Sequence, residues 1–516
     1  MSGESAGAPV LQNPHLRAVE DPGRPAQIMA ATGRVLTYRE LDEGSIRIAR
    51  LLRSGGLGRG AHVALLTGNH ELTLMVCWAA QRSGMYWTPL NTRWAVEELR
   101  HVVVDSTARV LFVTAETAPT AHRLLEGIDD PPIVLCLDDG DTGFPALSRE
   151  WRGVPAEPPD GECEGTDMLY SSGTTGRPKG VVPGSIGAPF GVVDVTMDAL
   201  RRYYGIDRDT VFLAATPLFH IAALASALMA HRVGGTVVVL EKFRPHAFLA
   251  AVPRYGITHT MVVPTMFGRL LEVPEDERAG YELGTLRFVG HGGAPCPTTV
   301  KANVLDWLGP IVYDCWGATE RPGLTIIGPE EWRRKPGSVG RAFVGSLHIL
   351  DESMREVGPG EVGQVYWDSS RPFEYHNDPE KTASSRDERG WCTVGDLGYL
   401  DEDGYLFLTD RAAFMIITGG ENVYPVEVEN VLIDHPAVRD VAVVGRPHVD
   451  LGQEVVAFVE PSPDVPVTDA LAAEIMAFAR HRLAGYKCPR AVEFRPELPR
   501  NATGKLVKRL LVDASG

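Results

Sequence analysis

The stretch YSSGTTGRPKGVV, from Tyr170 to Val182, places small hydroxyl residues, glycines and a lysine between two apolar flanks. Four serines and threonines, three glycines and Lys179 lie within the ten positions from 171 to 180. Glycine lets a backbone bend with its N–H groups turned inward, and successive inward N–H groups form a concave anion site. Lysine is otherwise scarce, with eight residues among the 50 Lys and Arg. The pattern therefore suits the binding of a polyphosphate.

The spacing of this loop differs from that of a Walker A loop, in which G-x-x-x-x-G-K-[ST] opens a helix. Arg177 and Pro178 precede Lys179, and the GVVP that follows it resists helix formation. A Ser/Gly-rich surface turn is the alternative for a stretch of this composition. The sequence indicates either a phosphate loop of another kind or such a turn.

The composition limits the classes of protein that come into question. The length of 516 residues predicts about two to four domains, and 44% apolar with 23% charged residues is ordinary for a globular enzyme. The net charge of −17, without a basic stripe, argues against a nucleic-acid partner. Seven scattered cysteines without a C-x-x-C pair argue against a zinc site or a disulfide framework. We therefore expect reduced thiols and a cytoplasmic location.

Two segments bear on membrane targeting. The N-terminus lacks a basic segment followed by an apolar one, so we expect no signal peptide. The most apolar window, Val211 to His231, is interrupted by Pro217 and His220 and lacks about 18 uninterrupted apolar residues. We expect a buried strand, a loop and a buried helix there, and no membrane span.

Short apolar runs alternate with helical patterns through most of the chain. The segment 34–69 predicts a turn, a helix that ends at Gly55 and Gly56, a turn and the strand HVALL. This alternation indicates an α/β architecture with largely buried sheets. From about Gly340 short strands dominate, and Asp403 with Gly404 marks a hairpin.

A last unit of mixed strands and helices follows Asp410, and its ~105 residues are near the usual size of a small domain. We therefore predict a boundary at Asp410–Arg411, with an N-terminal domain of residues 1–410 and a C-terminal domain of residues 411–516.

Seven motifs occur in the same order as in the adenylate-forming (ANL) superfamily of acyl-CoA synthetases, luciferases and peptide-synthetase adenylation domains. The chain resembles this superfamily from about Thr37 to Lys508, and within it the AMP-forming acid–CoA ligases. The resemblance implies an α/β fold with a large N-terminal domain of two α/β subdomains plus a small β-barrel, and a small mobile α+β C-terminal lid. The motifs are YSSGTTGRPKG (170–180), PLFH (217–220), GHGGAP (290–295), DCWGATE (314–320), VGD (394–396), DRAAFMIITGGENVYPVEVE (410–429) and PRNATGK (499–505).

The same resemblance implies a set of site residues. The catalytic residues would be Lys505, Glu320, Thr319 and His220, and the Mg²⁺ ligands would be Thr175 and Glu320. The residues that bind ATP or AMP would be Ser171, Ser172, Gly173, Thr174, Thr175, Gly176, Lys179, Gly292, Gly293, Ala294, Pro295, Asp314, Trp316, Gly317, Asp396 and Arg411.

The chemistry of the single residues agrees with these roles, and each has a plainer alternative. Glu320 offers a hard oxygen ligand for Mg²⁺, or is a solvated loop glutamate. Asp396 accepts hydrogen bonds from ribose hydroxyls, or is a turn aspartate. His220 lines an acyl pocket, or is a satisfied buried histidine. The Lys505 ammonium stabilises transition-state charge between carboxylate and α-phosphate, or is a flexible surface lysine.

The implied function is ATP-dependent activation of a carboxylic acid to an acyl-adenylate, with pyrophosphate release and transfer to coenzyme A. Two alternatives stay open. One is an adenylating enzyme with another acceptor or acid, as in nitrite-dependent diazotisation of an aromatic amine or in amide formation. The other is a catalytically inactive nucleotide-binding homologue, against which Glu320, Asp396, Arg411 and Lys505 argue.

The hinge departs from the pattern of acyl-CoA synthetases, which commonly read D-R-K-K-D-M-I-I-x-G-G-E-N. Here Ala412, Ala413 and Phe414 replace two lysines and an acid, and Val394 replaces the threonine of T-G-D. The VVPGSIGAP segment also replaces the T-H-x-N that often follows the phosphate loop. Alanine permits the backbone rotation of a hinge but offers no charge for ion pairing. The departure is either neutral drift or the mark of an altered thioester step with a weaker dependence on coenzyme A.

Overall fold

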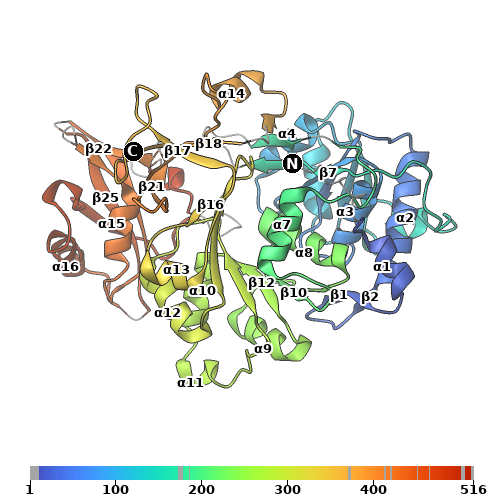
Figure 1. The fold of residues 1–516 in the computed structure, drawn as a ribbon, viewed down its shortest axis with the longest axis horizontal. Coiled ribbons are helices and arrows are strands. Elements are labelled where there is room, and N and C mark those ends of the chain that lie inside the picture. The colour runs from blue at the N-terminus through green and yellow to red at the C-terminus, as the bar shows by residue number, and fades with distance from the viewer. Residues whose placement is uncertain are drawn as a thin grey trace, which may run out of the picture.

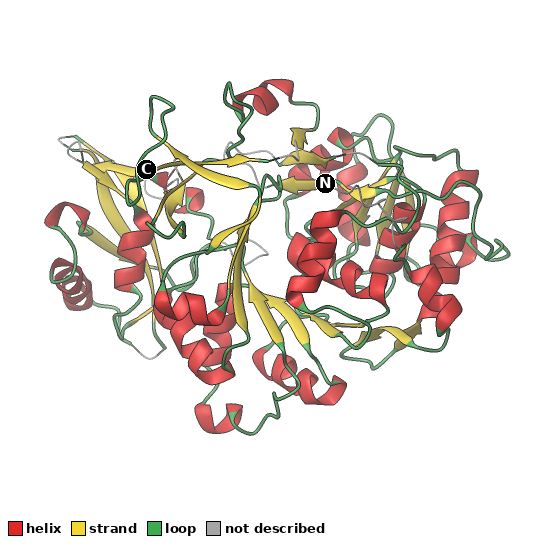
Figure 2. Cartoon of the chain, viewed as in Figure 1, coloured by secondary structure: helices red, strands yellow, loops and turns green. Residues whose placement is uncertain are grey.

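Two large sheets, with helices between them and outside them, form most of the molecule (Figures 1 and 2). A smaller unit of strands and helices, drawn orange to red in Figure 1, occupies the end of the molecule opposite to α2 (Tyr38–Ser54). The computed structural model describes residues 11–171, 178–184, 186–369, 373–411, 414–418, 421–449, 451–463, 465–500 and 506–512.

The larger sheet has nine strands, of which the six in the middle run parallel and the three at the edges pair antiparallel. Its first strand pairs with one more than 200 residues later, with Gln27 opposite Val237. The order is β16 (Arg341–Val344), β15 (Leu324–Ile327), β14 (Val312–Gly317), β13 (Phe288–His291), β12 (His259–Val262), β10 (Val211–Ala214), β11 (Thr236–Val239), β1 (Pro25–Met29) and β2 (Val35–Thr37).

The second sheet has five strands, all parallel. The order is β6 (Ile133–Cys136), β5 (Val110–Val113), β3 (His62–Leu66), β4 (Tyr86–Pro89) and β7 (Thr166–Asp167). Successive residues of β3 alternate between two hydrophobic cores, with Val63 and Leu65 in one and Ala64 and Leu66 in the other. The apolar runs of the sequence are therefore strands that are covered on both faces.

Three layers of helices cover these sheets, and they confirm the α/β class. The core between the sheets includes residues of α2, α3 (Thr73–Arg82) and α8 (Ile221–Val233), with α1 (Pro14–Glu20) and α7 (Val195–Tyr204) packed against it. The outer face of the nine-stranded sheet carries α9 (Pro245–Tyr255), α10 (Pro264–Leu271), α12 (Thr298–Leu308) and α13 (Pro329–Arg334). The outer face of the five-stranded sheet carries α4 (Val96–Asp105) and α5 (Ala118–Leu125). Short helices α6 (Leu147–Glu150), α11 (Glu275–Arg278) and α14 (Pro379–Ser384) lie in connections.

Two small antiparallel sheets correspond to the small β-barrel that the resemblance implies for the N-terminal domain. The predicted hairpin at Asp403 and Gly404 joins the last two strands of the first of them. That sheet has the order β17 (Ser346–Leu350), β18 (Gly363–Asp368), β20 (Asp396–Leu400) and β21 (Leu406–Arg411). The other has the order β19 (Phe373–Tyr375), β9 (Lys179–Pro183) and β8 (Leu169–Ser171).

The C-terminal unit has its own sheet and two cores, one on each face. The strand order is β23 (Glu421–Val423), β22 (Ile416–Thr418), β25 (Gly452–Pro461) and β24 (Val438–His448), and β26 (Ala491–Phe494) pairs with β25. The helices are α15 (Pro425–Leu432), α16 (Asp469–Arg480) and α17 (Arg509–Val512), with a 3₁₀ turn at Gly485–Lys487. The boundary at Asp410–Arg411 stays a prediction, and these two residues end β21.

The apolar window from Val211 contains strand β10, a loop and helix α8, as the sequence predicts. Within the described ranges, no helix is both long enough and apolar enough to cross a bilayer.

Candidate functional site

The predicted phosphate loop joins strands β8 and β9, which pair antiparallel. Ser171 ends β8 directly opposite Lys179, which begins β9, so the two flanks of the loop are held together. The middle of the loop, with Ser172, Gly173, Thr174, Thr175 and Gly176, lies outside the described residues. The mouth of the loop is thus fixed by sheet hydrogen bonds, and the third strand of this sheet, β19, extends it.

Lys179 is held on one side of this sheet by two groups. Its Nζ donates to Asp378 Oδ2 at 3.2 Å and lies 5.9 Å from the centroid of the Tyr375 ring. The Asp378 carboxylate also accepts the backbone N–H of Lys381, and this bond, followed by Lys179, lowers the pKa of Asp378. The side chain of Lys179 keeps 23% of its surface exposed, which leaves the ammonium accessible to an anion.

Tyr375 also connects Glu320 to Lys179. The Tyr375 hydroxyl donates to Glu320 Oε1 at 3.0 Å, and Glu320 is only 8% exposed. A buried carboxylate held by a phenol near a phosphate-loop lysine is a hard oxygen donor of the kind that Mg²⁺ prefers. Glu320 therefore fits the predicted metal ligand, while Thr175 lies outside the described residues. Thr319, next in the chain, is half-buried.

The residue that follows Glu320 anchors this segment to the five-stranded sheet. Arg321 forms an ion pair with Asp167 of β7 and adopts φ +53°, a left-handed conformation that costs free energy in a non-glycine residue. The ion pair holds the DCWGATE segment against β7 at the place where the chain makes this turn. Neither Arg321 nor Asp167 stands out in the sequence.

The glycine turn after β13 packs directly on β14. A Cβ on Gly292 would overlap the backbone oxygen of Cys315, so only glycine allows this approach. Gly293 has φ +81° with open space around its Cα, Ala294 is half-buried, and Pro295 is exposed. The turn thus lies directly beside the DCWGATE strand.

Strand β14 carries three of the predicted nucleotide residues. Trp316 stacks on Trp367 of β18, with ring centroids 5.5 Å apart and an interplanar angle of 19°. Gly317, the last residue of β14, is exposed. Asp314 is 9% exposed, and its Oδ2 accepts a hydrogen bond from Lys301 Nζ of α12 at 2.9 Å. Trp316 also packs in the hydrophobic cluster that contains Tyr375, which brings the β14 motif next to Glu320 and Lys179.

Asp396 and Arg411 face each other across the pair of strands β20 and β21. Asp396 begins β20 and is 6% exposed, and Arg411 ends β21. Two residues predicted to hold one nucleotide, 15 positions apart in the sequence, are therefore neighbours in the sheet.

His220 lies at the N-terminus of α8, where its backbone is the N-cap. The preceding PLF segment is fixed by Asn69, whose Oδ1 accepts the backbone N–H of Leu218 at 2.7 Å. Burial, with a smaller effect of the Arg93 charge, lowers the pKa of His220 to about 3, so the ring is neutral at ordinary pH. Its Nε2 is buried and makes no hydrogen bond to any residue that the structure describes.

The contacts join three of the predicted site residues into one region. Lys179, Glu320 and Trp316 gather around Tyr375, a residue that our sequence reasoning did not select. The only available signal for Tyr375 was its place in an aromatic strand, PFEYHN. Lys505 lies outside the described residues, as do Ala412 and Ala413 of the hinge.

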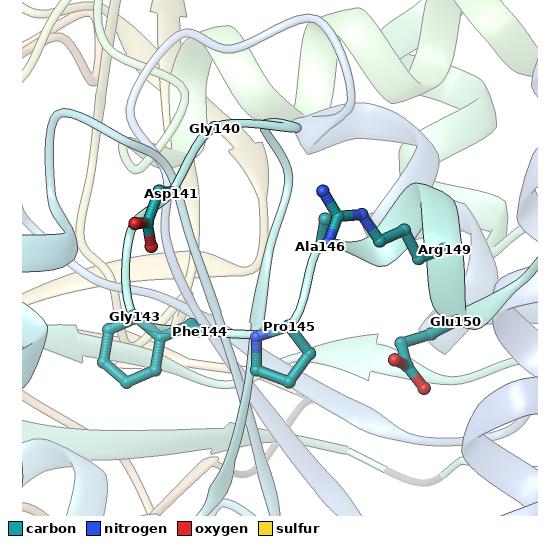
Figure 3. Close-up of a pocket in the computed structure, with 8 residues that line it drawn as sticks. All are labelled: Gly140, Asp141, Gly143, Phe144, Pro145, Ala146, Arg149 and Glu150. Atoms are coloured by element: carbon teal, nitrogen blue, oxygen red, sulfur yellow. The ribbon is translucent and has the colours of Figure 1, made fainter.

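A separate surface hollow is not part of this site. It lies between the loop after β6 and helix α6, where Arg149 and Glu150 project from the helix and Asp141 and Phe144 from the loop (Figure 3). Phe144 stacks on His122 with ring centroids 4.1 Å apart. None of the seven predicted motifs contributes a residue to its lining.

Comparison with known proteins agrees with this arrangement. The AMP-binding enzyme family matches residues 15–373, and the AMP-binding enzyme C-terminal domain matches residues 427–505. A feruloyl-CoA synthase from Amycolatopsis sp is 35% identical over 483 residues, covering 92% of this chain and 93% of that protein.

Solved structures share the fold over nearly the whole chain. ATP-bound MatB from Rhodopseudomonas palustris aligns with a TM-score of 0.82 and 28% identity, covering 97% of this chain and 99% of that one. The amide bond synthetase McbA from Marinactinospora thermotolerans aligns with a TM-score of 0.81 and 28% identity, covering 98% and 99%.

The chain therefore belongs to the AMP-binding enzyme family. Within it, the chain is an adenylating enzyme of the ANL superfamily, similar to acid–CoA ligases.

Proposed function

We propose that this enzyme activates a carboxylic acid with ATP and transfers the acyl group to coenzyme A. The observation that carries the proposal is the cluster around Tyr375, where Lys179 at the mouth of the phosphate loop and the buried carboxylate of Glu320 meet. The similarity to a feruloyl-CoA synthase supports an aryl acid as the substrate.

In the proposed first step, the substrate carboxylate attacks the α-phosphorus of ATP, the bond to the β-phosphate oxygen breaks, and pyrophosphate leaves. Lys179 neutralises phosphate charge, and Trp316 with the glycine turn forms a slot for adenine. Asp396 and Arg411 hold the ribose and its phosphate. His220, neutral because it is buried, lines the acyl pocket without placing a charge near the reacting carboxylate.

Glu320 and Thr175 are the residues that would hold Mg²⁺. The bound ion would neutralise charge on the phosphates. Most of the acceleration then comes from placing the reactants and stabilising charge, because phosphoryl and adenylyl transfer require little covalent chemistry from the protein.

An ATP–pyrophosphate exchange assay with a panel of aryl and fatty acids tests the first step. Acid-dependent exchange is expected, and Lys505→Ala should lower its rate by about 10²–10³-fold if that ammonium stabilises the transition state. ATP binding of the variant, measured by calorimetry, should stay close to wild type. Exchange by Lys505→Ala at the wild-type rate would contradict the role of Lys505. If none of the acids in the panel supports exchange by the wild-type enzyme, the proposed function is wrong.

A second acceptor is favoured by the hinge. Phe414 is half-buried there and lies 5.7 Å from Lys508 Nζ, so an aromatic–cation contact stands where acyl-CoA synthetases commonly carry an acid. The structural similarity to an amide bond synthetase supports an amine as the alternative acceptor. Titration of coenzyme A and of amines at saturating ATP and acid distinguishes the two acceptors. Saturable formation of a thioester would exclude an amine as the acceptor. A product that forms only when an amine is present would exclude coenzyme A.

A further inference from the structure

A lysine is buried completely behind the predicted adenine slot. Lys301, on the first turns of α12, has no exposed surface, and its Nζ lies 4.8 Å from the centroid of the Trp332 ring. Its hydrogen bond goes to Asp314 Oδ2 at 2.9 Å. A buried ion pair is weak support for stability, since hydrophobic residues of similar volume often serve as well. The pair therefore calls for a role other than stability.

Asp314 is the member of the pair that lies on β14, the strand that carries Trp316 of the predicted slot. It lies in β14 two residues before Trp316, opposite His291 in the register of β13 and β14. Its Oδ2 is engaged by Lys301, with His291 Nε2 at 3.6 Å, which is too long for a hydrogen bond. Among the residues that the structure describes, no hydrogen-bond donor contacts its Oδ1. One oxygen of the carboxylate is fixed from behind and the other stays available.

Adenine and guanine differ in the group on carbon 6 of the purine ring, and this is the group that the available Asp314 oxygen would meet. Adenine carries an amino group, a donor, where guanine carries a carbonyl oxygen, an acceptor. An ionised carboxylate only accepts, whereas a protonated one also donates. An Asp314 that is ionised and fixed in orientation would accept from adenine and repel guanine.

We propose that Lys301 is a positioning residue that fixes the Asp314 carboxylate as an acceptor for the adenine amino group and so makes the enzyme select ATP over GTP. The inference rests on the proposed function in one respect, that the slot between the glycine turn and Trp316 binds the base of the nucleotide.

Several ionisable groups surround Asp314. Lys301 faces it from α12 and His291 from β13, and the thiols of Cys296 and Cys315 are nearby. Burial, with a further contribution from Asp314, raises the pKa of each thiol to about 12, and burial lowers the pKa of His291 to about 4.

The test compares the binding of ATP and GTP to the full-length protein by calorimetry, without any acid substrate. Wild type should bind ATP at least about 100-fold more tightly than GTP. Lys301→Met should lower this ratio by about tenfold or more, because the Asp314 carboxylate loses the donor that fixes it. A structural loss alone would weaken the binding of both nucleotides and leave their ratio unchanged.

Two further variants complete the design. Lys301→Met/Asp314→Asn contains no buried charge at this pair, and its unfixed amide can turn either its oxygen or its nitrogen to the base, so the ratio should also be low. Lys335→Met is the matched control, because it removes ion pairs to Asp401 and Asp403 away from the slot and should keep the wild-type ratio.

The proposal is wrong if both the single and the double variant keep the wild-type ratio of ATP to GTP affinity. If Lys301→Met does not fold, the double variant alone decides, since its neutral pair avoids an isolated buried charge. Because nucleotide binding is measured directly, the inference can fail while acid-dependent exchange succeeds, and it can hold if no tested acid is activated.

Discussion

At the scale of single residues, Tyr375 does more than its sequence context indicates. Its hydroxyl orients Glu320, and its ring lies beside the Lys179 ammonium. Hydrogen bonding to a charged group is typically worth about 1.5–3 kcal/mol, so the phenol is a substantial part of what fixes this carboxylate. A tyrosine thus couples the residue predicted to hold Mg²⁺ to the residue predicted to hold phosphate.

We predict that Tyr375→Phe raises the Mg²⁺ concentration needed for half-maximal ATP–pyrophosphate exchange by about tenfold, because Glu320 loses its orienting donor. The ring remains, so Lys179 keeps its neighbour and the thermal midpoint should change little. Tyr366→Phe is the control, since that hydroxyl lies on β18, in the other small antiparallel sheet, and contacts Met354 Sδ at 3.8 Å. An unchanged Mg²⁺ requirement in Tyr375→Phe would show that the phenol does not orient a metal ligand.

At the scale of secondary-structure elements, the site depends on how closely the turn after β13 approaches β14. We predict that Gly292→Ala weakens ATP binding by at least about tenfold, because its Cβ would overlap the Cys315 carbonyl and push the turn away. Calorimetry with ATP measures the loss. Gly284→Ala is the control, since a Cβ there meets nothing within 4 Å, and equal ATP affinity of the two variants would contradict the prediction.

At the same scale, some features of the fold could be predicted from the sequence and others could not. Strands such as β5 and β11 were predictable, because both of their faces are buried and all of their residues except Thr236 are apolar. The partner of β1 was not, because the pairing of Gln27 with Val237 is set by packing between distant segments. The site residues within motifs were predicted by resemblance, whereas Tyr375 and Arg321 make contacts across long sequence separations.

Lys301 illustrates the limit of prediction from sequence for charged residues. A lysine in an amphipathic helix is normally a solvent-exposed residue, and composition predicts that position for it. Its burial becomes visible only when α12 is packed on the nine-stranded sheet and Asp314 supplies a counter-charge.

At the scale of the whole molecule, an ion pair joins surfaces of the two predicted domains. Arg439 of β24 donates to both oxygens of Glu272 after α10, at 2.9 and 3.1 Å, and also to Glu460. Arg439 and Glu272 are 40% and 49% exposed, so the pair contributes about 0–1 kcal/mol and is weakened by salt.

We predict that Glu272→Gln changes the ratio of adenylation rate to acyl-transfer rate by less than about fivefold, because the pair stabilises only one relative orientation of the domains. In wild type, about 0.5 M NaCl should produce a shift in the same direction, since salt screens the exposed pair. Single-turnover measurement of each half-reaction gives the ratio. Arg333→Gln, which breaks an exposed pair with Asp306 within the N-terminal region, is the control. Opposite shifts from salt and from Glu272→Gln would contradict the role of the pair.

The stability of the whole molecule should depend on pH through buried histidines. His231 and His291 have no exposed surface, and burial lowers the pKa of each to about 4. As the pH falls below about 6.5, the unfolded chain takes up protons that the native state does not bind, so stability decreases. Each histidine contributes up to about 1.4 kcal/mol per pH unit in this range. The urea midpoint should therefore drop between pH 7 and pH 5, and a constant midpoint would contradict the prediction.

The pairing of β1 with β11 also governs the order in which the chain can be assembled during synthesis. The first strand of the nine-stranded sheet leaves the ribosome more than 200 residues before its parallel neighbour. β9 likewise waits for β19, since Val181 pairs with Tyr375. Domains generally fold as units as the chain is made, and long-range parallel pairing is slow. Until residues 236–239 have emerged, β1 can therefore pair only with its antiparallel neighbour β2, and its other edge stays unpaired.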